Sequence, residues 1–258
     1  MPAEPSITID IAQVAARIRQ VAQPGEVLLI GVTGSVAAGK TTFSHALKED
    51  LAQTHRVATV STDGFLLSNA VLTSRDLMMR KGFPETFDTA AMVAMMHQAR
   101  IGPIAAPVYS HTTYDVDPAL SVEIAQQDIL IFEGLGLSPQ GDGANPADAL
   151  DLLIYIDAAE DDIERWFVTR FLGLWAAAEH NPASFYAQFR TMDEAQTAQF
   201  ASAVWSQINL PNLRDHILMA RDFANIVLLK RVDHRLFLVR DLALPTKVES
   251  QEQAPPSK

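Results

Sequence analysis

The segment VLLIGVTGSVAAGKTT, residues 27–42, decides the fold of this chain. Its apolar run over residues 27–30 predicts a buried strand, and the residues from Gly34 to Thr41 match the pattern G-x-x-x-x-G-K-[ST]. Helical spacing follows from Thr41, so the motif lies between a strand and a helix, as it does in phosphate-binding loops. This context strongly favours a phosphate-binding loop over a glycine turn that binds nothing.

The loop predicts a nucleotide site. Its glycines let backbone N–H groups turn toward a phosphate, and the following helix adds the positive end of its dipole. Lys40 supplies a charge between the β- and γ-phosphates, and the Thr41 hydroxyl is the expected Mg²⁺ ligand. We therefore expect ATP and Mg²⁺ as cofactors. The loop residues expected to contact the nucleotide are Gly34, Ser35, Val36, Ala37, Ala38, Gly39, Lys40, Thr41 and Thr42.

Apolar runs alternate with helical patterns along the rest of the chain. Further buried strands are expected at residues 57–60, 128–132, 152–156, 226–229 and 236–239. Helices are expected at residues 9–21, 41–53 and 88–100, and through most of 161–224 with breaks at 181–182 and 210–212. This alternation predicts an α/β fold of the P-loop NTPase type, with a mostly parallel sheet and helices on both faces.

The 258 residues fit one α/β domain, which we place at residues 1–247. Residues 66–127 form a long insertion between two expected strands, and insertions of this length are usually functional. We expect this insertion and the helical region 161–224 to form an acceptor site and a lid. Residues 248–258 are polar with a double proline, which predicts a disordered tail.

Composition excludes several classes of function. The chain has 20 Lys and Arg, 31 Asp and Glu, a net charge of −11 and no cysteine. The acidic balance disfavours nucleic acid and anionic membranes as partners, and the lack of cysteine excludes disulfides, thiolate zinc sites and cysteine nucleophiles. No apolar run is long enough to span a membrane and the start lacks a signal-peptide pattern, so we expect a cytoplasmic protein that acts on a small molecule.

Two carboxylates follow expected strands. Asp63 ends the strand at 57–60, at the edge where open α/β sheets bind ligands, so it can accept a substrate hydroxyl proton. From position alone, a turn cap beside Gly64 is an equally good reading of Asp63. Glu133 ends the next strand and is expected to hold Mg²⁺ directly or through water. Two acids converging on a phosphate-binding loop favour catalysis over simple binding.

Several further segments carry a family resemblance. They are STDGF at 61–65, KGFPETFD at 81–88, APVYSH at 106–111, Tyr114-Asp115, DILIFEG at 128–134, WFVTRF at 166–171, WSQIN at 205–209 and Asp233-His234. With the phosphate-binding loop, they make the chain resemble the bacterial type I pantothenate kinases over about residues 26–240. These enzymes belong to the P-loop kinase group of phosphoribulokinase and uridine kinase.

The resemblance implies ATP-dependent phosphorylation of the primary hydroxyl of pantothenate to 4'-phosphopantothenate, the first step of coenzyme A biosynthesis, by a homodimer. It implies that Asp63 is the base. It assigns the pantothenate contacts to Tyr109, His111, Tyr114, Phe167 and Asn209. For the dimer, a helical face around residues 47–51 is a candidate surface.

Two further roles come from the resemblance, and each has a plainer alternative. Arg170 corresponds to an arginine that reaches the transferred phosphate, whereas position alone favours a surface ion pair with Glu164. His234 corresponds to a ring that stacks on adenine, whereas a solvated histidine at a strand start is nearly as good a reading.

The chain departs from the family at three places. His45 stands where the family has an arginine that binds coenzyme A phosphates, so we expect weaker feedback inhibition. Phe167 replaces a tyrosine, and only residues 1–26 precede the first expected strand where the family has a longer helical extension. These departures predict altered acceptor contacts and looser adenine recognition.

Two alternatives therefore remain at this point. One is a kinase of another small hydroxyl compound, such as a nucleoside, a sugar or glycerate. The other is a catalytically inactive nucleotide-binding regulator, which would have no chemical need to keep Lys40, Thr41, Asp63, Glu133 and Arg170 together.

Overall fold

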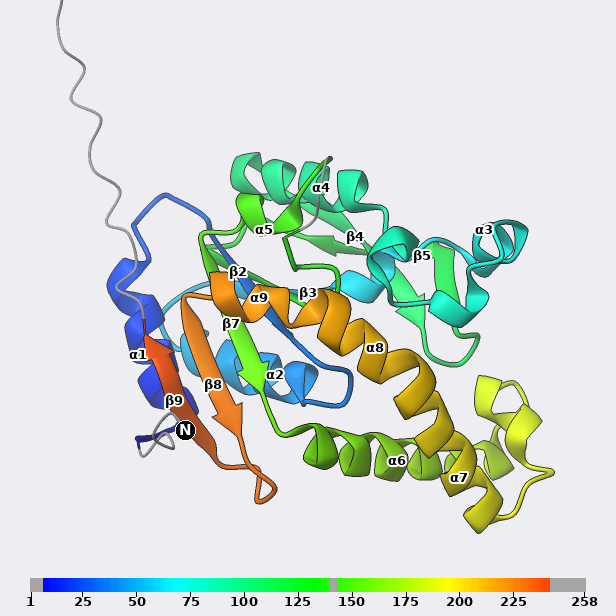
Figure 1. Ribbon diagram of the computed structural model, residues 1–258. Helices are drawn as coiled ribbons and strands as arrows, with labels where there is room; N and C mark the ends of the chain where they lie inside the picture. The colour runs from blue at the N-terminus through cyan, green and yellow to red at the C-terminus, as the bar shows by residue number, and fades with distance from the viewer. Residues whose placement is uncertain (1–6, 140–142, 242–258) are drawn as a thin grey trace, which may run out of the picture.

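A computed structural model describes residues 7–139 and 143–241, so the expected tail at 248–258 lies outside the described residues. At its centre is a seven-stranded sheet in the order β1-β9-β8-β7-β2-β6-β3 (Figure 1). Neighbouring strands from β8 to β3 are parallel, and β9 is antiparallel to both β8 and β1. The sheet strands are β1 (Thr8–Ile9), β2 (Leu28–Gly34), β3 (Val57–Ser61), β6 (Ile129–Glu133), β7 (Leu152–Asp157), β8 (Ile226–Lys230) and β9 (Leu236–Asp241). The predicted mostly parallel α/β sheet is confirmed.

Helices cover both faces because successive side chains of each buried strand point to opposite sides. In β2, Ile30 and Val32 join the cluster formed with α1 (Ile11–Val21) and α2 (Lys40–Leu51). Leu29 points the other way, into the cluster that contains residues of α4 (Thr89–Ile101), α5 (Pro146–Ala149) and α9 (Met219–Phe223). The core is therefore two apolar layers with the sheet between them.

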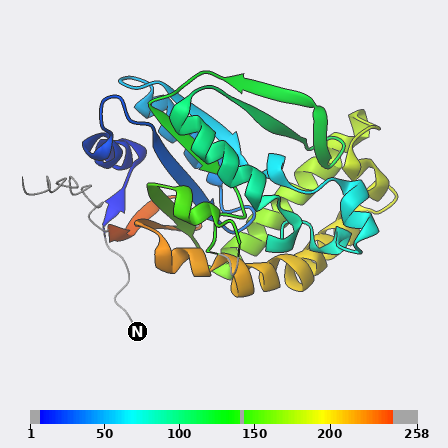
Figure 2. The same cartoon turned by 90° about the horizontal axis from the view of Figure 1, so that it is seen from above.

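The insertion holds more structure than its sequence predicts. The expected helix is present as α4, and α3 (Asn69–Ser74) precedes it. The insertion also forms an antiparallel hairpin of β4 (Ile104–Ser110) and β5 (Asp115–Ile124), which pairs separately from the main sheet. Seen from above, this hairpin forms an arm beside the central strands (Figure 2).

The helical region begins with α6 (Glu160–Ala177), and the expected break at 181–182 is confirmed. The expected break at 210–212 is wrong. From α7 (Glu194–Val204) the helix continues through a π turn at Trp205–Asn209, α8 (Leu210–Asn212) and a second π turn at Leu213–Ile217 into α9. Pro211 is tolerated because the wider π turn before it relieves the bond and the space that a proline removes from a regular helix.

Two smaller expectations are also corrected. Ile9 belongs to strand β1 and not to the first helix, which begins at Ile11. Leu47 and Leu51 are fully buried against the chain's own α1 and sheet, so these two side chains are not available to the dimer surface expected around residues 47–51. No helix among the described residues has the length and apolar character that crossing a bilayer requires.

Candidate active site

The phosphate-binding loop connects β2 to α2 at the carboxyl edge of the sheet. Ala37 and Gly39 have left-handed backbone angles, with φ of 62° and 95°. At Gly39 the absence of a side chain also leaves room for Lys230, since a Cβ there would lie 2.8 Å from the Lys230 Nζ atom. The buried Ser35 hydroxyl has no hydrogen-bond partner within the described part of the chain. An unsatisfied donor inside a loop of inward-turned N–H groups fits a phosphate ligand.

Lys40 lies inside the loop that it terminates. Its Nζ atom donates to the carbonyl oxygens of Gly34 at 3.2 Å and Ser35 at 2.9 Å. Burial lowers the pKa of Lys40 to about 8, although the carboxylates of Glu133 and Asp63 oppose that shift. The ammonium is therefore charged at pH 7, held by backbone carbonyls and near both predicted acids.

Glu133 ends β6 as a buried carboxylate, 8% exposed. The Thr41 hydroxyl is 3.2 Å from its Oε1 atom and 3.1 Å from its Oε2 atom. Burial raises the pKa of Glu133, while Lys40 opposes the rise. The described residues contain no cluster of three or more His, Cys, Asp or Glu side chains suited to a metal. One carboxylate and one hydroxyl suit Mg²⁺, which commonly takes its remaining ligands from water and substrate phosphates.

Asp63 follows β3 in a 3₁₀ turn over Thr62–Phe65. The Asp63 backbone N–H donates to the Ser61 hydroxyl at 3.4 Å, so Ser61 and not Asp63 caps this turn. Within the described residues the Asp63 carboxylate accepts no hydrogen bond. Its charge nevertheless acts on the pKa values of Lys40, Glu133 and Tyr109. Asp63 is thus near both the phosphate-binding loop and the insertion, and the turn-cap reading is wrong because Ser61 is the cap.

The insertion contributes an aromatic group beside Asp63. The Tyr109 ring centroid lies 5.2 Å from that of His111 and 6.0 Å from that of Tyr114, both in edge contacts. Tyr114 stacks on Phe185, with ring centroids 4.2 Å apart. Burial raises the pKa of Tyr109, and it raises that of Tyr114 to about 12. Both phenols keep their protons at neutral pH and can donate hydrogen bonds to a ligand.

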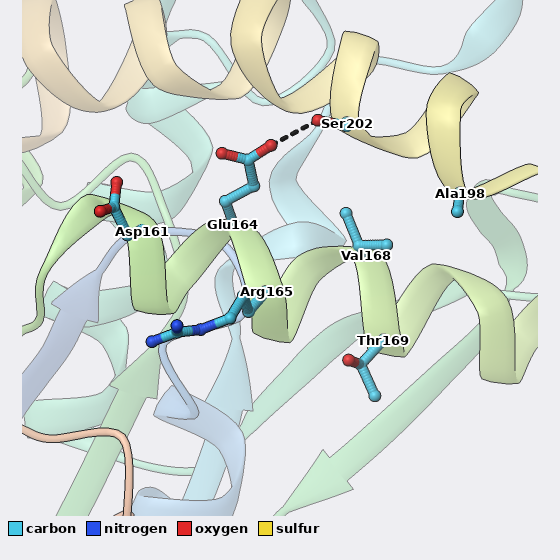
Figure 3. A pocket seen from close by; sticks show the side chains of 7 residues that line it. All are labelled: Asp161, Glu164, Arg165, Val168, Thr169, Ala198 and Ser202. Carbon is cyan, nitrogen blue, oxygen red and sulfur yellow. Dashed lines mark hydrogen bonds between the residues drawn. The ribbon is translucent and has the colours of Figure 1, made fainter. Parts of the chain in front are cut away.

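Helix α6 carries Arg170, which is exposed and has no carboxylate partner among the residues that the structure describes. The alternative partner Glu164 accepts a hydrogen bond from Ser202 instead (Figure 3). Arg170 lies near the site, because its charge opposes the rise in pKa of Tyr114 and the protonation of Lys40. The ion pair with Glu164 is therefore not formed.

The other two predicted substrate residues are placed differently. Phe167 packs between Phe171 and Trp205, with centroids 6.3 Å and 6.2 Å away, against the large apolar cluster. Asn209 ends the π turn, and its side chain forms no hydrogen bond with the described residues. The structure thus brings Tyr109, His111 and Tyr114 together, without adding Phe167 or Asn209 to their contacts.

Lys230, the last residue of β8, contacts the phosphate-binding loop, and His234 follows it in the turn before β9. His234 is exposed, with φ of 65°, and its ring centroid lies 5.3 Å from that of Trp166. The Lys230 Nζ atom donates to the Ala38 carbonyl at 3.0 Å and lies 4.2 Å from the Trp166 ring centroid. Sequence reasoning missed Lys230, although a charged residue directly after a buried parallel strand was a usable signal.

A separate cavity of about 550 Å³ opens between α6 and α7 (Figure 3). Its lining residues are Asp161, Glu164, Arg165, Val168, Thr169, Ala198 and Ser202. None of them belongs to the phosphate-binding loop or the insertion, so this cavity is distinct from the group around Asp63.

The sequence of the chain is similar to those of known kinases. Residues 29–168 match the model of the phosphoribulokinase and uridine kinase family. The chain is 44% identical over 224 residues to a pantothenate kinase of Myxococcus xanthus, covering 82% of this chain and 71% of that protein. It is 42% identical over 228 residues to a pantothenate kinase of Mesorhizobium japonicum, covering 84% and 70% respectively.

Solved structures share the fold at lower sequence identity. One, described as a candidate fructose transport system kinase of Silicibacter sp. TM1040, has a TM-score of 0.68 at 23% identity and covers 92% of this chain and 100% of that one. A D-glycerate 3-kinase of Cryptococcus neoformans has a TM-score of 0.57 at 13% identity, covering 88% and 97%. At these identities the likeness concerns the fold alone.

Proposed function

The chain belongs to the phosphoribulokinase and uridine kinase family and, within it, to the pantothenate kinases, and on that premise we propose that it transfers the γ-phosphoryl group of ATP to the primary hydroxyl of pantothenate. The observation that carries the proposal is the place of the turn that holds Asp63: it follows Ser61, which pairs with Glu133 across β3 and β6, and its Gly64 lies against Pro107 of β4. A carboxylate near both a phosphate-binding loop and a group of phenols suits proton transfer from a bound alcohol.

Each residue of the site has a separate role in the proposed reaction. Asp63 accepts the hydroxyl proton as the substrate oxygen bonds to the γ-phosphorus and the bond to the ADP oxygen breaks. Lys40 and Arg170 stabilise the negative charge that spreads over the transferred phosphoryl oxygens. Thr41 and Glu133 would hold Mg²⁺, which neutralises phosphate charge when bound. Tyr109, His111 and Tyr114 would orient the acceptor by hydrogen bonds and ring contacts.

A panel of acceptors tests this function. The purified protein is incubated with ATP, Mg²⁺ and pantothenate, uridine, fructose or glycerate, and products are identified by mass spectrometry. Only pantothenate is expected to gain a phosphoryl group and release ADP. Asp63→Ala should lower kcat by about 10²–10⁴-fold, the usual contribution of a general base, while the Kd for ATP changes little. Turnover of another acceptor without turnover of pantothenate would reject the assignment, and unchanged turnover of the variant would remove Asp63 as the base.

We also propose that the enzyme is a homodimer in the cytoplasm, on the basis of its family membership. Light scattering with size-exclusion chromatography checks the first part, with twice the mass of the 28.2 kDa chain expected. Fractionation of cells that express the protein checks the second part.

A further inference from the structure

The segment at residues 81–88 belongs to the family motif but has no part in the roles assigned above. Its residues contact the long helix on one side and the aromatic group on the other. The Asn212 side chain donates to the Gly82 carbonyl at 2.9 Å, and Phe83 meets His216 edge to face at 5.6 Å. Both of those contacts reach the long helix after α7. Lys81 extends the other way, into the aromatic group.

The Lys81 ammonium has four contacts in this group. Its Nζ atom donates to the Asn69 Oδ1 atom at 2.6 Å and to the Tyr114 carbonyl at 2.5 Å. The same atom lies 4.5 Å from the Tyr114 ring centroid and 4.9 Å from that of Tyr109, within the range of cation–π attraction. One compact cation thus contacts the rings of both Tyr109 and Tyr114, whose pKa values the charge of Asp63 also affects.

The backbone at Tyr114 explains why such an anchor is needed. Tyr114 has φ of 55°, a left-handed angle that is unfavourable for a residue with a large side chain. Its carbonyl accepts from Lys81 and also from the Asn69 Nδ2 atom at 3.1 Å, while its ring stacks on Phe185. The strained angle therefore persists because hydrogen bonds and a ring contact hold the residue from opposite sides.

The charge of Lys81 is set by its surroundings. Burial lowers its pKa to about 8, and the carboxylates of Asp115 and Asp63 oppose that shift. The Asn69 backbone N–H donates to Asp115 at 2.9 Å, so the acid that supports Lys81 also fixes the start of α3. The ammonium is half-buried and forms no ion pair with the residues that the structure describes, and its hydrogen-bond acceptors are an amide and a carbonyl.

We propose that Lys81 is a positioning residue of the acceptor site, which fixes the backbone of Tyr114 and the facing rings of Tyr109 and Tyr114 beside Asp63. The inference rests on the proposed function, because it identifies this aromatic group as the place where the pantothenate chain lies. It assigns acceptor selection to a lysine that touches the two tyrosines and acts through them.

Lys81→Met tests the proposal, since methionine keeps an unbranched stem and removes the ammonium. The matched variant is Lys230→Met, because Lys230 also donates to a backbone carbonyl and lies over a ring, but on the nucleotide side. For each variant and the wild type, kcat and the KM values for pantothenate and ATP are measured, with melting temperatures alongside. Lys81→Met should raise the KM for pantothenate at least tenfold and leave that for ATP within twofold. Lys230→Met should shift mainly the KM for ATP.

The outcomes separate the alternatives. A KM for pantothenate within twofold of wild type in Lys81→Met, or an equal rise in both KM values, would overturn the inference, as would a loss confined to kcat and melting temperature. A wild type that does not phosphorylate pantothenate would overturn the proposed function itself, before any variant is compared. If Lys81→Met does not fold, Asn69→Ala replaces it. This variant removes one anchor of Lys81 and one donor to Tyr114, and should raise the KM for pantothenate alone by at least threefold.

Discussion

Lys40 and Glu133 show how single residues set the charge of the site. Burial disfavours the charged form of each group, so it lowers the pKa of Lys40 and raises that of Glu133. The charge of each group partly offsets the cost of burying the other. The two groups therefore depend on each other to stay ionised, whereas the negative charge of Asp63 supports the charge of Lys40 and disfavours that of Glu133. A nucleotide brings phosphate charge to the lysine and, with a cation, positive charge to the carboxylate.

The pKa of Lys40 predicts a pH limit on nucleotide use. The quantity kcat/KM for ATP reports ionisations of the free enzyme. Lys40 is charged below a pKa of about 8 and neutral above it, so kcat/KM for ATP should fall as the pH rises through about 8. A lysine at the ordinary value of 10.5 would keep the profile level to a much higher pH.

Initial rates between pH 6 and 10 check this prediction. Lys81 also has a pKa of about 8, so the profile must be repeated with Lys81→Met. In this variant kcat/KM for ATP should still fall at alkaline pH. A level profile up to pH 10 in the wild type, or loss of the limb in that variant, would contradict the assignment to Lys40.

His45 predicts weak inhibition by coenzyme A. It is exposed on α2, and its charge opposes the rise in the pKa of Glu133, so it faces the phosphate side of the site. An imidazole ring lacks the planar fork of donors by which an arginine makes a bidentate contact to a phosphate. His45→Arg should lower the Ki for coenzyme A by about tenfold or more, since a charge-assisted hydrogen bond contributes about 1.5–3 kcal/mol.

Inhibition titrations at several ATP concentrations measure this effect. Glu49→Arg is the matched control, because it adds an arginine at an exposed position one turn farther along α2 and should leave the Ki unchanged. Wild-type protein in which micromolar coenzyme A competes with ATP would show that His45 does not weaken the inhibitor site.

At this scale the sequence predicts motif residues well and long side chains poorly. Lys40, Thr41 and Glu133 converge because a motif or a strand end fixes their backbone positions. For Lys81 and Lys230, the role depends on where a flexible four-carbon stem ends, which requires the neighbouring segments. No local pattern predicts that Lys81 reaches a carbonyl in the turn between β4 and β5.

Among the elements, hairpin β4–β5 and the turn after β3 form the junction that places the proposed acceptor residues. The hairpin register shifts between Pro107 and Val108. At Gly64, a Cβ atom would lie 2.4 Å from the Pro107 carbonyl oxygen. Only glycine allows this backbone to approach the turn that carries Asp63.

Gly64→Ala should therefore separate the hairpin from Asp63. Overpacking of this kind costs about 1–3 kcal/mol, and each kcal/mol lowers the melting temperature of a chain of this size by about 2–4 °C. The KM for pantothenate should rise more than the KM for ATP, because β4 carries Tyr109. Calorimetry and steady-state kinetics measure both effects.

Gly173→Ala is the control for Gly64→Ala. No atom lies within 4 Å of a Cβ at Gly173, which is inside α6. Alanine should leave the melting temperature unchanged or raise it, since it favours a helix by about 0.5–1 kcal/mol over glycine. Equal losses of stability in both variants would remove the contact with Pro107 as the cause.

The elements also show which patterns can be recognised in the sequence. Buried parallel strands can be recognised because their apolar runs are continuous. Hairpin β4–β5 escapes prediction because exposed Leu120 and Val122 alternate with polar residues, so no continuous apolar run marks the strand. Pro211 predicts a helix end from its usual local effect, whereas two π turns and the packing of Trp205 and Leu213 continue the helix.

For the whole molecule, the net charge of −11 and the binding of a polyphosphate are compatible. Net charge acts at long range and is screened by salt, whereas Lys40, the loop N–H groups and the α2 dipole act at contact distance. The acidic surface therefore limits non-specific binding to nucleic acid without weakening the loop. The fold explains why the local groups act independently of the net charge, because the ends of β2, β3 and β6 lie together at one edge of the sheet.

The burial of Leu47 predicts how the assembly and the fold depend on α2. Leu47 is 0% exposed and packs with Val14 and Ile18 of α1, so it contributes to the single-chain core. Leu47→Ala should lower the free energy of unfolding by about 2–5 kcal/mol, as for other buried leucines. Ile101→Ala, at a side chain 77% exposed, should change it by no more than about 0.5 kcal/mol. Urea denaturation and light scattering over a range of protein concentrations distinguish a role of Leu47 in the single-chain core from a role in the subunit interface. A lower molar mass with an unchanged unfolding midpoint in Leu47→Ala would return this face of α2 to the subunit interface.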